Sequence, residues 1–501
     1  MLLAPRTDPA RKDAAASPAG PVPAAAGSAG AAAQGLPPVP TYTEMGRFTL
    51  PIVLGLATYA LQGLLDAAFV GQLGTAPLAA LAMANVTYIT GMVVLLGMMR
   101  SAMTFLAQAY GAGSRASLGE WVSQYQWLAL TSLPILLLAA QGFPWVAQAA
   151  NLSPGTAAAA GLYLNIRVWE VPFALTTVLY GTLYTATGRS AFPMAVQWGA
   201  VALNVALNYG LTLGHLGFPR LGVVGSATST LASQVAAAAT MIGATYLGPM
   251  RRRHGLRLLR RPHGRTLLRI LAVGFPQGLG DGLELAAFLA FFTIVGWLGE
   301  AAVAASNIGL QVTQVLYMPA IATGIAAASY AGRFIGAGAP GLVRITTHRI
   351  LRATALYMGG LGIPLWFLGA SIAGWFIADA EVVRQAGSVF KVMAVYQVFD
   401  ALGIVLRIAL SGAGDVRFPM AAVGVCGAAV MVPLSWWLSL RVQPGILGAW
   451  LGMLGYIVAL GAVLLWRFER GAWMRMGVLG GTGGQPGVLP AAGTELIAPR
   501  G

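Results

Sequence analysis

Residues 51–74 read PIVLGLATYALQGLLDAAFVGQLG, and residues 276–299 read PQGLGDGLELAAFLAFFTIVGWLG. Each stretch begins with a proline and ends in a VGxLG motif, and the two copies lie 225 residues apart. GAG triplets that begin at Gly111 and Gly336 keep the same offset. A register shared over this distance indicates that the chain has two halves built on one pattern.

The chain around these copies has the composition of a membrane protein. Of its 501 residues, 57% are hydrophobic and only 9% are charged, and the mean hydropathy is +0.72. A soluble domain carries roughly 25% charged residues. The composition therefore excludes a soluble protein, and the single cysteine, Cys426, leaves no disulfide within the chain.

Apolar stretches long enough to cross a bilayer, which takes about 20 residues, recur along the chain. We place them at 47–70, 78–110, 121–141, 157–184, 192–213, 222–247, 267–297, 302–335, 345–370, 383–411, 418–440 and 446–468. Backbone amides find no water in lipid, and these runs lack the alternation of barrel strands, so we expect helices. The sequence thus predicts an all-α polytopic membrane protein with twelve transmembrane helices in two six-helix lobes around a central cleft.

Arginines predict the orientation of this bundle. The segment 249–269 holds eight arginines and no acidic residue, so we expect it to stay in the cytoplasm. The net charge of +15 then reflects topology and contact with the lipid bilayer, and nucleic acid is not expected as a partner. The expected divisions are a disordered cytoplasmic tail (1–40), an N-lobe (41–248), a basic cytoplasmic linker loop (249–266), a C-lobe (267–470) and a flexible tail (471–501), with both termini in the cytoplasm.

Ionisable residues inside the apolar stretches are the candidates for function, because burying charge in lipid is costly. Asp66 lies in the first stretch, Glu284 in the seventh and Asp400 in the tenth, with Tyr396 one helical turn before Asp400. Asp281 shares a helix face with Glu284, and we expect it nearer the end of its helix. Carboxylates of this kind can hold a small cation, exchange a proton or attract an organic cation.

Structural roles compete with these functions. Arg407 follows Asp400 by two turns, so pairing with Arg407 is the alternative for Asp400 and Glu284. Arg167 and Glu170 have the spacing of a local ion pair. Asn204 and Asn208, four residues apart, line the cavity or join helices by hydrogen bonds.

Several chemistries have no support in the sequence. It contains no HExxH motif, no GxxxxGK[ST] loop and no GxSxG elbow, so we expect neither an enzyme nor a cofactor. Energy for uphill movement across the membrane would then come from an ion gradient or from a partner that this sequence does not contain.

The segment LLDAAFVGQLGTAPLAALAMANVTYI (64–89), followed by LAQAYGAG, resembles the opening of the multidrug and toxic compound extrusion (MATE) transporters. The stretch LNVALNYGLTLGHLGFPRLGVVGSATST (203–230) looks like helices 5 and 6 of their bacterial NorM-like branch. The FP pair followed by Glu284, and YQVFDA at 396–401, resemble the helix 7 and helix 10 motifs of that branch. The likeness covers roughly residues 41–470.

The resemblance implies an antiporter of the bacterial inner membrane, expected as a monomer, that exports organic, mostly cationic drugs in exchange for Na⁺ or H⁺. It implies a C-lobe cation site, which is a possible Na⁺ site, at Glu284, Tyr396 and Asp400. Asp66 matches the coupling carboxylate of helix 1, and Asn204 matches a polar partner on helix 5. Other branches have a carboxylate where this chain has Asn208, and the resemblance therefore favours Na⁺ at the C-lobe site.

The alternative is a lipid-linked oligosaccharide flippase of the same superfamily. A cavity that holds a pyrophosphate should be cationic, whereas the intramembrane charges identified in this sequence are mainly acidic.

Overall fold

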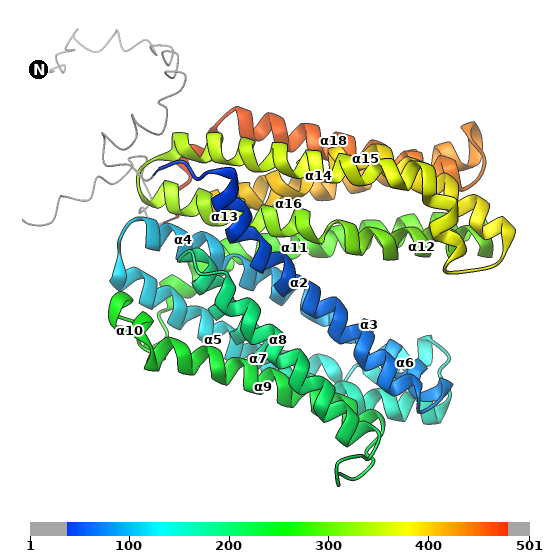
Figure 1. Cartoon of the computed structure of the whole chain (residues 1–501), viewed down its shortest axis with the longest axis horizontal. Helices are drawn as coiled ribbons and strands as arrows, with labels where there is room; N and C mark the ends of the chain where they lie inside the picture. Colours follow the sequence, from blue (N-terminus) through cyan, green and yellow to red (C-terminus); the bar gives the residue numbers. More distant parts are fainter. Residues whose placement is uncertain (1–37, 479–501) are drawn as a thin grey trace, which may run out of the picture. The chain divides into compact units, whose positions relative to one another are not determined.

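The computed structural model describes residues 38–478, and within this range residues 40–478 belong to one compact unit. Its first half consists of α2 (Tyr42–Gly71), α3 (Thr75–Arg100), α4 (Ala102–Gly111), α5 (Arg115–Ala140), α6 (Phe143–Ala149), α7 (Pro154–Ala186), α8 (Ala191–Leu207), the π-helix η1 (Asn208–Thr212), α9 (Val223–Leu247) and α10 (Pro249–His254). Its second half consists of α11 (Gly264–Gly296), α12 (Glu300–Leu316), α13 (Met318–Gly336), α14 (Pro340–Gly374), α15 (Ala380–Ala413), α16 (Arg417–Cys426), π-helix η2 (Gly427–Met431), α17 (Val432–Trp437), π-helix η3 (Leu438–Val442), α18 (Ile446–Glu469) and the 3₁₀ turn η4 (Ala472–Arg475) (Figure 1).

Each of the twelve predicted stretches falls on helix, and the all-α fold class is confirmed. Four stretches are interrupted: 78–110 covers α3 and α4, 192–213 covers α8 and η1, 302–335 covers α12 and α13, and 418–440 covers α16 to η3. By length and composition, eight helices within 38–478 can cross a membrane, or nine if the bent pair α12 and α13 forms one span. The other three stretches belong to α7, α8 and α9, which hold much of the buried polar network described below.

The repeated VGxLG motif ends one helix and begins the next. Its last glycine, Gly74 in the first copy and Gly299 in the second, precedes α3 and α12 with φ of +117° and +105°. Residues that carry a side chain rarely adopt these backbone φ values, so glycine suits both turns. The motif therefore marks the same tight connection in each half.

The repeated GAG motif lies where α4 and α13 cross. A side chain on Gly111 would overlap the Arg333 backbone, and one on Gly336 would overlap the Gln108 backbone. These two contacts exchange under the 225-residue offset, and Gly332 meets its own equivalent, Ala107, between them. The repeat inferred from the sequence is thus a pseudo-twofold relation in space, with its axis passing through this crossing.

Helix α11 joins the two halves along its first turns. Gly278 packs against α3 so closely that a Cβ there would lie 3.0 Å from the Cα of Val94, and Gly274 packs against Met98. Small residues let helix backbones approach in this way. The start of the second half is therefore held against the first.

The predicted linker loop 249–266 is more ordered than a loop, because it begins with α10 and α11 starts inside it. Side chains of α5 hold the connection between these helices. The Arg260 amide donates to Ser123 Oγ at 2.6 Å, Trp127 Nε1 donates to the Arg260 carbonyl at 2.8 Å, and the His263 amide donates to Gln124 Oε1 at 3.0 Å. The linker is thus bound to the first half along its length.

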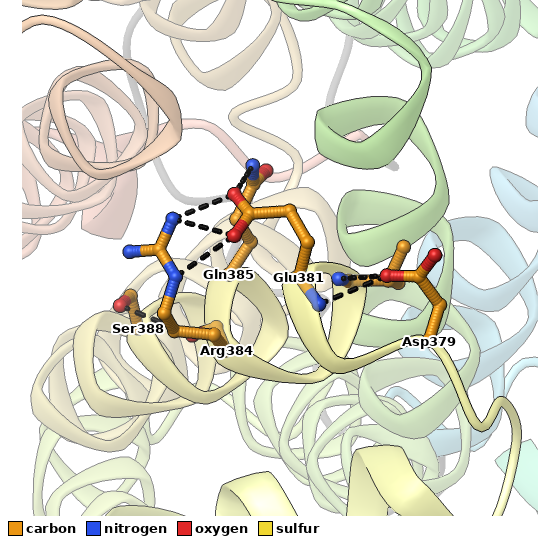
Figure 2. Close-up of polar contacts among 6 residues, drawn as sticks. Asp379, Glu381, Arg384, Gln385 and Ser388 are labelled. Carbon is orange, nitrogen blue, oxygen red and sulfur yellow. Dashed lines mark hydrogen bonds and ion pairs between the residues drawn. The ribbon is translucent and has the colours of Figure 1, made fainter.

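The loop before α15 ends in a polar cluster (Figure 2). Asp379 Oδ1 caps α15 by accepting from the amides of Glu381 and Val382 at 2.9 and 3.0 Å. One turn into the helix, Arg384 pairs with Glu381 at 2.6 Å, and both side chains are exposed. This cluster stabilises a helix end and takes no part in the cavity described below.

The structure describes only a small part of each predicted tail. The tail up to residue 37, and the second tail from residue 479, lie outside the described residues. Residues 471–478, expected to belong to the second tail, instead include η4 and the fully buried Trp473, which stacks on Phe468 with ring centroids 5.1 Å apart. The helical body therefore extends beyond its predicted end at residue 470.

Candidate functional site

A cavity of about 640 Å³ lies between the two halves. Apolar side chains form most of its wall, and volumes of roughly 300–1,000 Å³ suit drug-sized ligands. Polar side chains reach it from both halves. They are Tyr59, Gln62, Asp66, Asn85, Tyr88, Arg100, Thr104, Arg167, Glu170, Thr182, Gln234, Gln277, Asp281, Arg407 and Ser411.

Hydrogen bonds join the two halves where α4 meets the end of α15. Thr104 Oγ1 donates to the Ser411 carbonyl at 2.7 Å, and Gln108 Nε2 donates to the Ala413 carbonyl at 3.2 Å. Gln108 Oε1 accepts from the Val478 amide at 2.9 Å, so the segment after α18 joins the same contact. These bonds join the two halves beside the cavity.

Asp66, predicted as a functional carboxylate, is buried on α2 beside the cavity. Its Oδ1 accepts from Asn208 Nδ2 at 3.0 Å, and its Oδ2 accepts from Thr230 Oγ1 at 3.2 Å. Asn204 completes the network, because it accepts from Asn208 at 3.1 Å and donates to Thr230 at 3.2 Å. Asn208 thus bonds the carboxylate directly and Asn204 acts through Asn208 and Thr230, whereas the resemblance had implied only Asn204 as a polar partner.

The surroundings of Asp66 differ from those of the other acids in the cavity. Within 38–478 no arginine, lysine or histidine forms an ion pair with it. Glu170, in contrast, pairs with Arg167 at 2.8 Å, as the sequence predicted, and the Arg167 guanidinium also stacks on Tyr88. Asp66 therefore accepts side-chain hydrogen bonds only from neutral donors within the described residues.

A chain of ion pairs crosses the cavity from one half to the other. Arg100 Nη1 on α3 lies 2.7 Å from Asp281 Oδ2 on α11. Arg407 Nη1 on α15 lies 3.5 Å from Asp281 Oδ1 and 2.7 Å from Glu284 Oε2. Asp281 lies in the middle of α11, so our expectation that it lies nearer a helix end was wrong.

The three residues of the predicted sodium site have different surroundings in the structure. Glu284 adopts the pairing with Arg407 that the sequence left as the alternative. Tyr396 is buried, Asp400 is partly buried, and neither makes a hydrogen bond or ion pair with Glu284 in the described chain. No group of three acidic, histidine or cysteine side chains within 38–478 is arranged to hold a metal ion. The sodium site therefore stays a prediction.

Arg100, which lines the cavity, and Thr230, which donates to Asp66, are two site residues that were not predicted from the sequence. Arg100 stands in an apolar run, LLGMMRSAM, and its charge was a signal that could have been read. Thr230 carried no comparable signal, because threonine is common in membrane helices. With Arg100, Arg167 and Arg407 facing Asp66, Glu170 and Asp281, the cavity is not mainly acidic, which corrects the sequence-based expectation.

Comparison with known proteins agrees with this architecture. The MatE family model matches residues 51–210 and 276–437, one segment in each half. The chain belongs to the MatE family. Its relatives include the probable multidrug resistance protein NorM of Burkholderia mallei, which is 28% identical over 437 residues that cover 85% of this chain and 92% of the relative.

Solved MATE structures share the MatE fold with this chain. A MATE crystal structure in the bent conformation superposes with a TM-score of 0.79 at 18% identity and covers 87% of this chain and 97% of the other. The outward-facing conformation of a multidrug resistance MATE family transporter gives 0.78 at 17% identity, with coverage of 86% and 96%. The twelve-helix, two-lobe arrangement is therefore that of the MATE fold.

Proposed function

We propose that this MatE protein is a secondary active multidrug efflux antiporter, a monomer that exports organic, mostly cationic compounds in exchange for Na⁺ or H⁺. The observation that carries the proposal is Asp66, a buried carboxylate at the cavity wall with only neutral hydrogen-bond donors around it. The name of the NorM relatives supports multidrug efflux.

Competition between the coupling ion and the organic cation for Asp66 couples the inward movement of the ion to the outward movement of the organic cation. An ionised, buried carboxylate is costly unless it is hydrogen bonded or neutralised, so a coupling ion or an organic cation stabilises it. Binding of Na⁺ or H⁺ removes the charge that holds the organic cation. A ligand shifts a conformational equilibrium only when it binds the two states differently. We expect a second state, in which the halves separate at α4, to lack the bonds that Thr104 and Gln108 make in this structure.

The C-lobe residues provide a second place for the coupling ion. Sodium binding by Glu284, Tyr396 and Asp400 requires Arg407 to release Glu284, because Arg407 lies 2.7 Å from its carboxylate. A sodium-dependent rise in melting temperature that disappears in Asp400→Asn would support a site there. An equal rise in that variant would place sodium elsewhere.

The distribution of arginines supports the orientation that we propose for the bundle. The linker between α10 and α11 carries Arg257, Arg260 and Arg261, and α10 itself carries three more arginines. The connections 72–74, 141–153 and 297–299 at the other helix ends carry none, and the connection 213–222 carries only Arg220. Because basic loops stay in the cytoplasm, the linker end and both termini face inward.

Efflux from inverted vesicles tests the proposal. We expect an imposed Na⁺ or pH gradient to drive accumulation of ethidium, and the gradient that suffices alone identifies the coupling ion. Asp66→Asn, which keeps the shape of the side chain, should abolish gradient-driven accumulation. Glu381→Gln, in the exposed polar cluster at the start of α15, should retain gradient-driven accumulation. Wild-type transport by Asp66→Asn would exclude Asp66 from coupling.

The flippase remains the second candidate because of one observation. Three arginines line the cavity, and guanidinium groups are suited to bind pyrophosphate. Three carboxylates balance them, so the cavity as a whole is not cationic. Translocation of a fluorescent pyrophosphate-linked lipid by the purified protein, without ethidium transport, would favour the flippase.

A further inference from the structure

We propose that a groove between α14 and α15 binds an anionic phospholipid of the cytoplasmic leaflet, with the phosphate of the lipid at Arg352 and one acyl chain in the groove. The groove has a volume of about 530 Å³, and its wall is apolar except at one end. The lining residues are Arg352, Ala355, Leu356, Gly359, Gly360 and Val398. None of these six lines the cavity between the halves, so the site is separate from the one proposed for transported compounds.

A pair of glycines shapes the groove. Helices α14 and α15 run side by side (Figure 1). A Cβ on Gly359 would lie 3.1 Å from Val398 Cγ2, so the two helices are in close contact there. A Cβ on Gly360 would meet nothing within 4 Å, so the space beside this glycine is open. Atoms that line an open apolar groove lose dispersion contacts unless another apolar group fills it, and in a membrane that group is an acyl chain.

The length of α14 shows the depth of the groove in the membrane. Trp375, which ends the helix, is 82% exposed, and exposed tryptophans are enriched at the interface between membrane and water. The rise from Arg352 to Trp375 is about 34 Å at about 1.5 Å per residue. This is close to the hydrocarbon thickness of a bilayer, roughly 30 Å. Leu356, Ile363 and Phe367 lie between them and are exposed, as lipid-facing side chains are. Arg352 therefore lies at the headgroups of the leaflet opposite Trp375.

This leaflet is the one at the linker end of the bundle. Gly336, shortly before α14, packs against Gln108 of α4. Tyr110, at the end of α4, contacts His254 of α10 with ring centroids 5.8 Å apart. The orientation that we propose for the bundle places this end in the cytoplasm, and the cytoplasmic leaflet carries anionic lipids that attract arginines at its surface.

The arginine at the end of the groove is available to a lipid. Arg352 is exposed, and no acidic side chain within 38–478 forms an ion pair with it. Arg349, one turn earlier on α14, donates from Nη1 to the Pro40 carbonyl at 3.1 Å and likewise forms no ion pair in the described chain. A guanidinium can hold a phosphate through parallel N–H bonds. Positive charge at the headgroup level, with an apolar groove directly below it, fits a molecule with an anionic head and an apolar chain.

Two lipids that differ only in the headgroup provide the test. Phosphatidylglycerol is anionic, and phosphatidylcholine with the same acyl chains has no net charge. Native mass spectrometry of the full-length protein in detergent would give the dissociation constant of the first bound molecule of each lipid. We expect the protein to bind phosphatidylglycerol more tightly. Glycerol 3-phosphate has the phosphate without the chains and should not displace phosphatidylglycerol; displacement at equal concentration would show a site for free phosphate and would refute the lipid proposal.

Substitutions at the two ends of the groove should have different effects. Arg352→Gln should lower the preference for phosphatidylglycerol over phosphatidylcholine by about 5-fold, the effect of one arginine near anionic headgroups. Arg417→Gln removes an exposed arginine at the start of α16 and is the matched control, which should keep the preference. Gly360→Leu fills the groove and should weaken both lipids while their ratio stays the same. Gly374→Leu, at an equally open position at the end of α14, should bind both lipids as the wild type does.

Two results would overturn the proposal. Equal losses of preference in Arg352→Gln and Arg417→Gln would show that the preference follows net charge rather than a site. Wild-type dissociation constants for both lipids in Gly360→Leu would show that no chain occupies the groove. Thermal unfolding checks that each variant is folded, and Gly360→Ala, a smaller addition toward the same space, replaces Gly360→Leu if that variant does not fold. The test involves no dye or ion gradient, so its failure and the failure of the antiporter proposal are separate results.

Discussion

The contact between α3 and α11 leads to a quantitative prediction for Gly278→Ala. A Cβ at this position would overlap the Val94 carbonyl and lie 3.0 Å from the Val94 Cα. Carbon atoms prefer a separation of about 3.5–4.0 Å, so the helices must move apart by roughly 0.5–1 Å. Overpacking of this kind costs about 1–3 kcal/mol, against a gain of about 0.5–1 kcal/mol from replacing glycine in a helix. We therefore expect Gly278→Ala to lower the free energy of unfolding by about 1 kcal/mol, within the range of about 0–2.5 kcal/mol that these two terms allow.

A glycine one turn later on α11 supplies the control. An added Cβ on Gly282 meets nothing within 4 Å, so Gly282→Ala should keep only the favourable helix term of about 0.5–1 kcal/mol. Thermal unfolding of the purified variants in the same detergent should rank Gly282→Ala at or above the wild type and Gly278→Ala below it. Equal melting temperatures for the two variants would refute the argument that close backbone contact joins the halves here.

Three further variants test other parts of the structure. Glu170→Gln leaves the Arg167 guanidinium buried without its charge partner, and we expect a loss of about 3–5 kcal/mol in thermal unfolding. Trp127→Phe removes the hydrogen bond to the Arg260 carbonyl; limited trypsin digestion should then cut the arginine-rich linker faster, and an unchanged rate would show that the bond does not hold the linker. Burial and neighbouring arginines lower the pKa of His254 below its ordinary value of 6.5. The unfolded chain therefore binds a proton first as the pH falls through 6.5, and the wild type should lose stability there relative to His254→Gln.

The helical framework was predictable because each membrane span must satisfy its own backbone. Composition alone therefore located the twelve stretches, and the 225-residue offset located the equivalent turns at Gly74 and Gly299. The same offset identified Gly111 and Gly336, although only the structure revealed that each packs against the helix that carries the other, at Arg333 and Gln108. The interruptions within four of the stretches were missed, because apolar composition continues through bends and π-turns.

The candidate site was predictable in part. Asp66, Asp281 and Glu284 stood out because an acid in an apolar run is rare at any position, and the Arg167–Glu170 pair follows from helical spacing. The partner of Asp281 could not be inferred, since Arg100 is 181 residues away along the chain and belongs to the other half. The choice of Arg407 between Glu284 and Asp400 likewise depended on how α11 and α15 pack.

The sequence by itself determined that this chain is a membrane protein of two related halves, because hydropathy and repeat spacing are properties of the chain read in order. Only the tertiary structure decided which charges neutralise one another and which remain available. Coulombic pairing depends on distances of a few ångströms between residues far apart in sequence, and those distances arise from helix packing. The packing left Asp66 with neutral hydrogen-bond donors, and it paired Arg100 with Asp281 across the two halves.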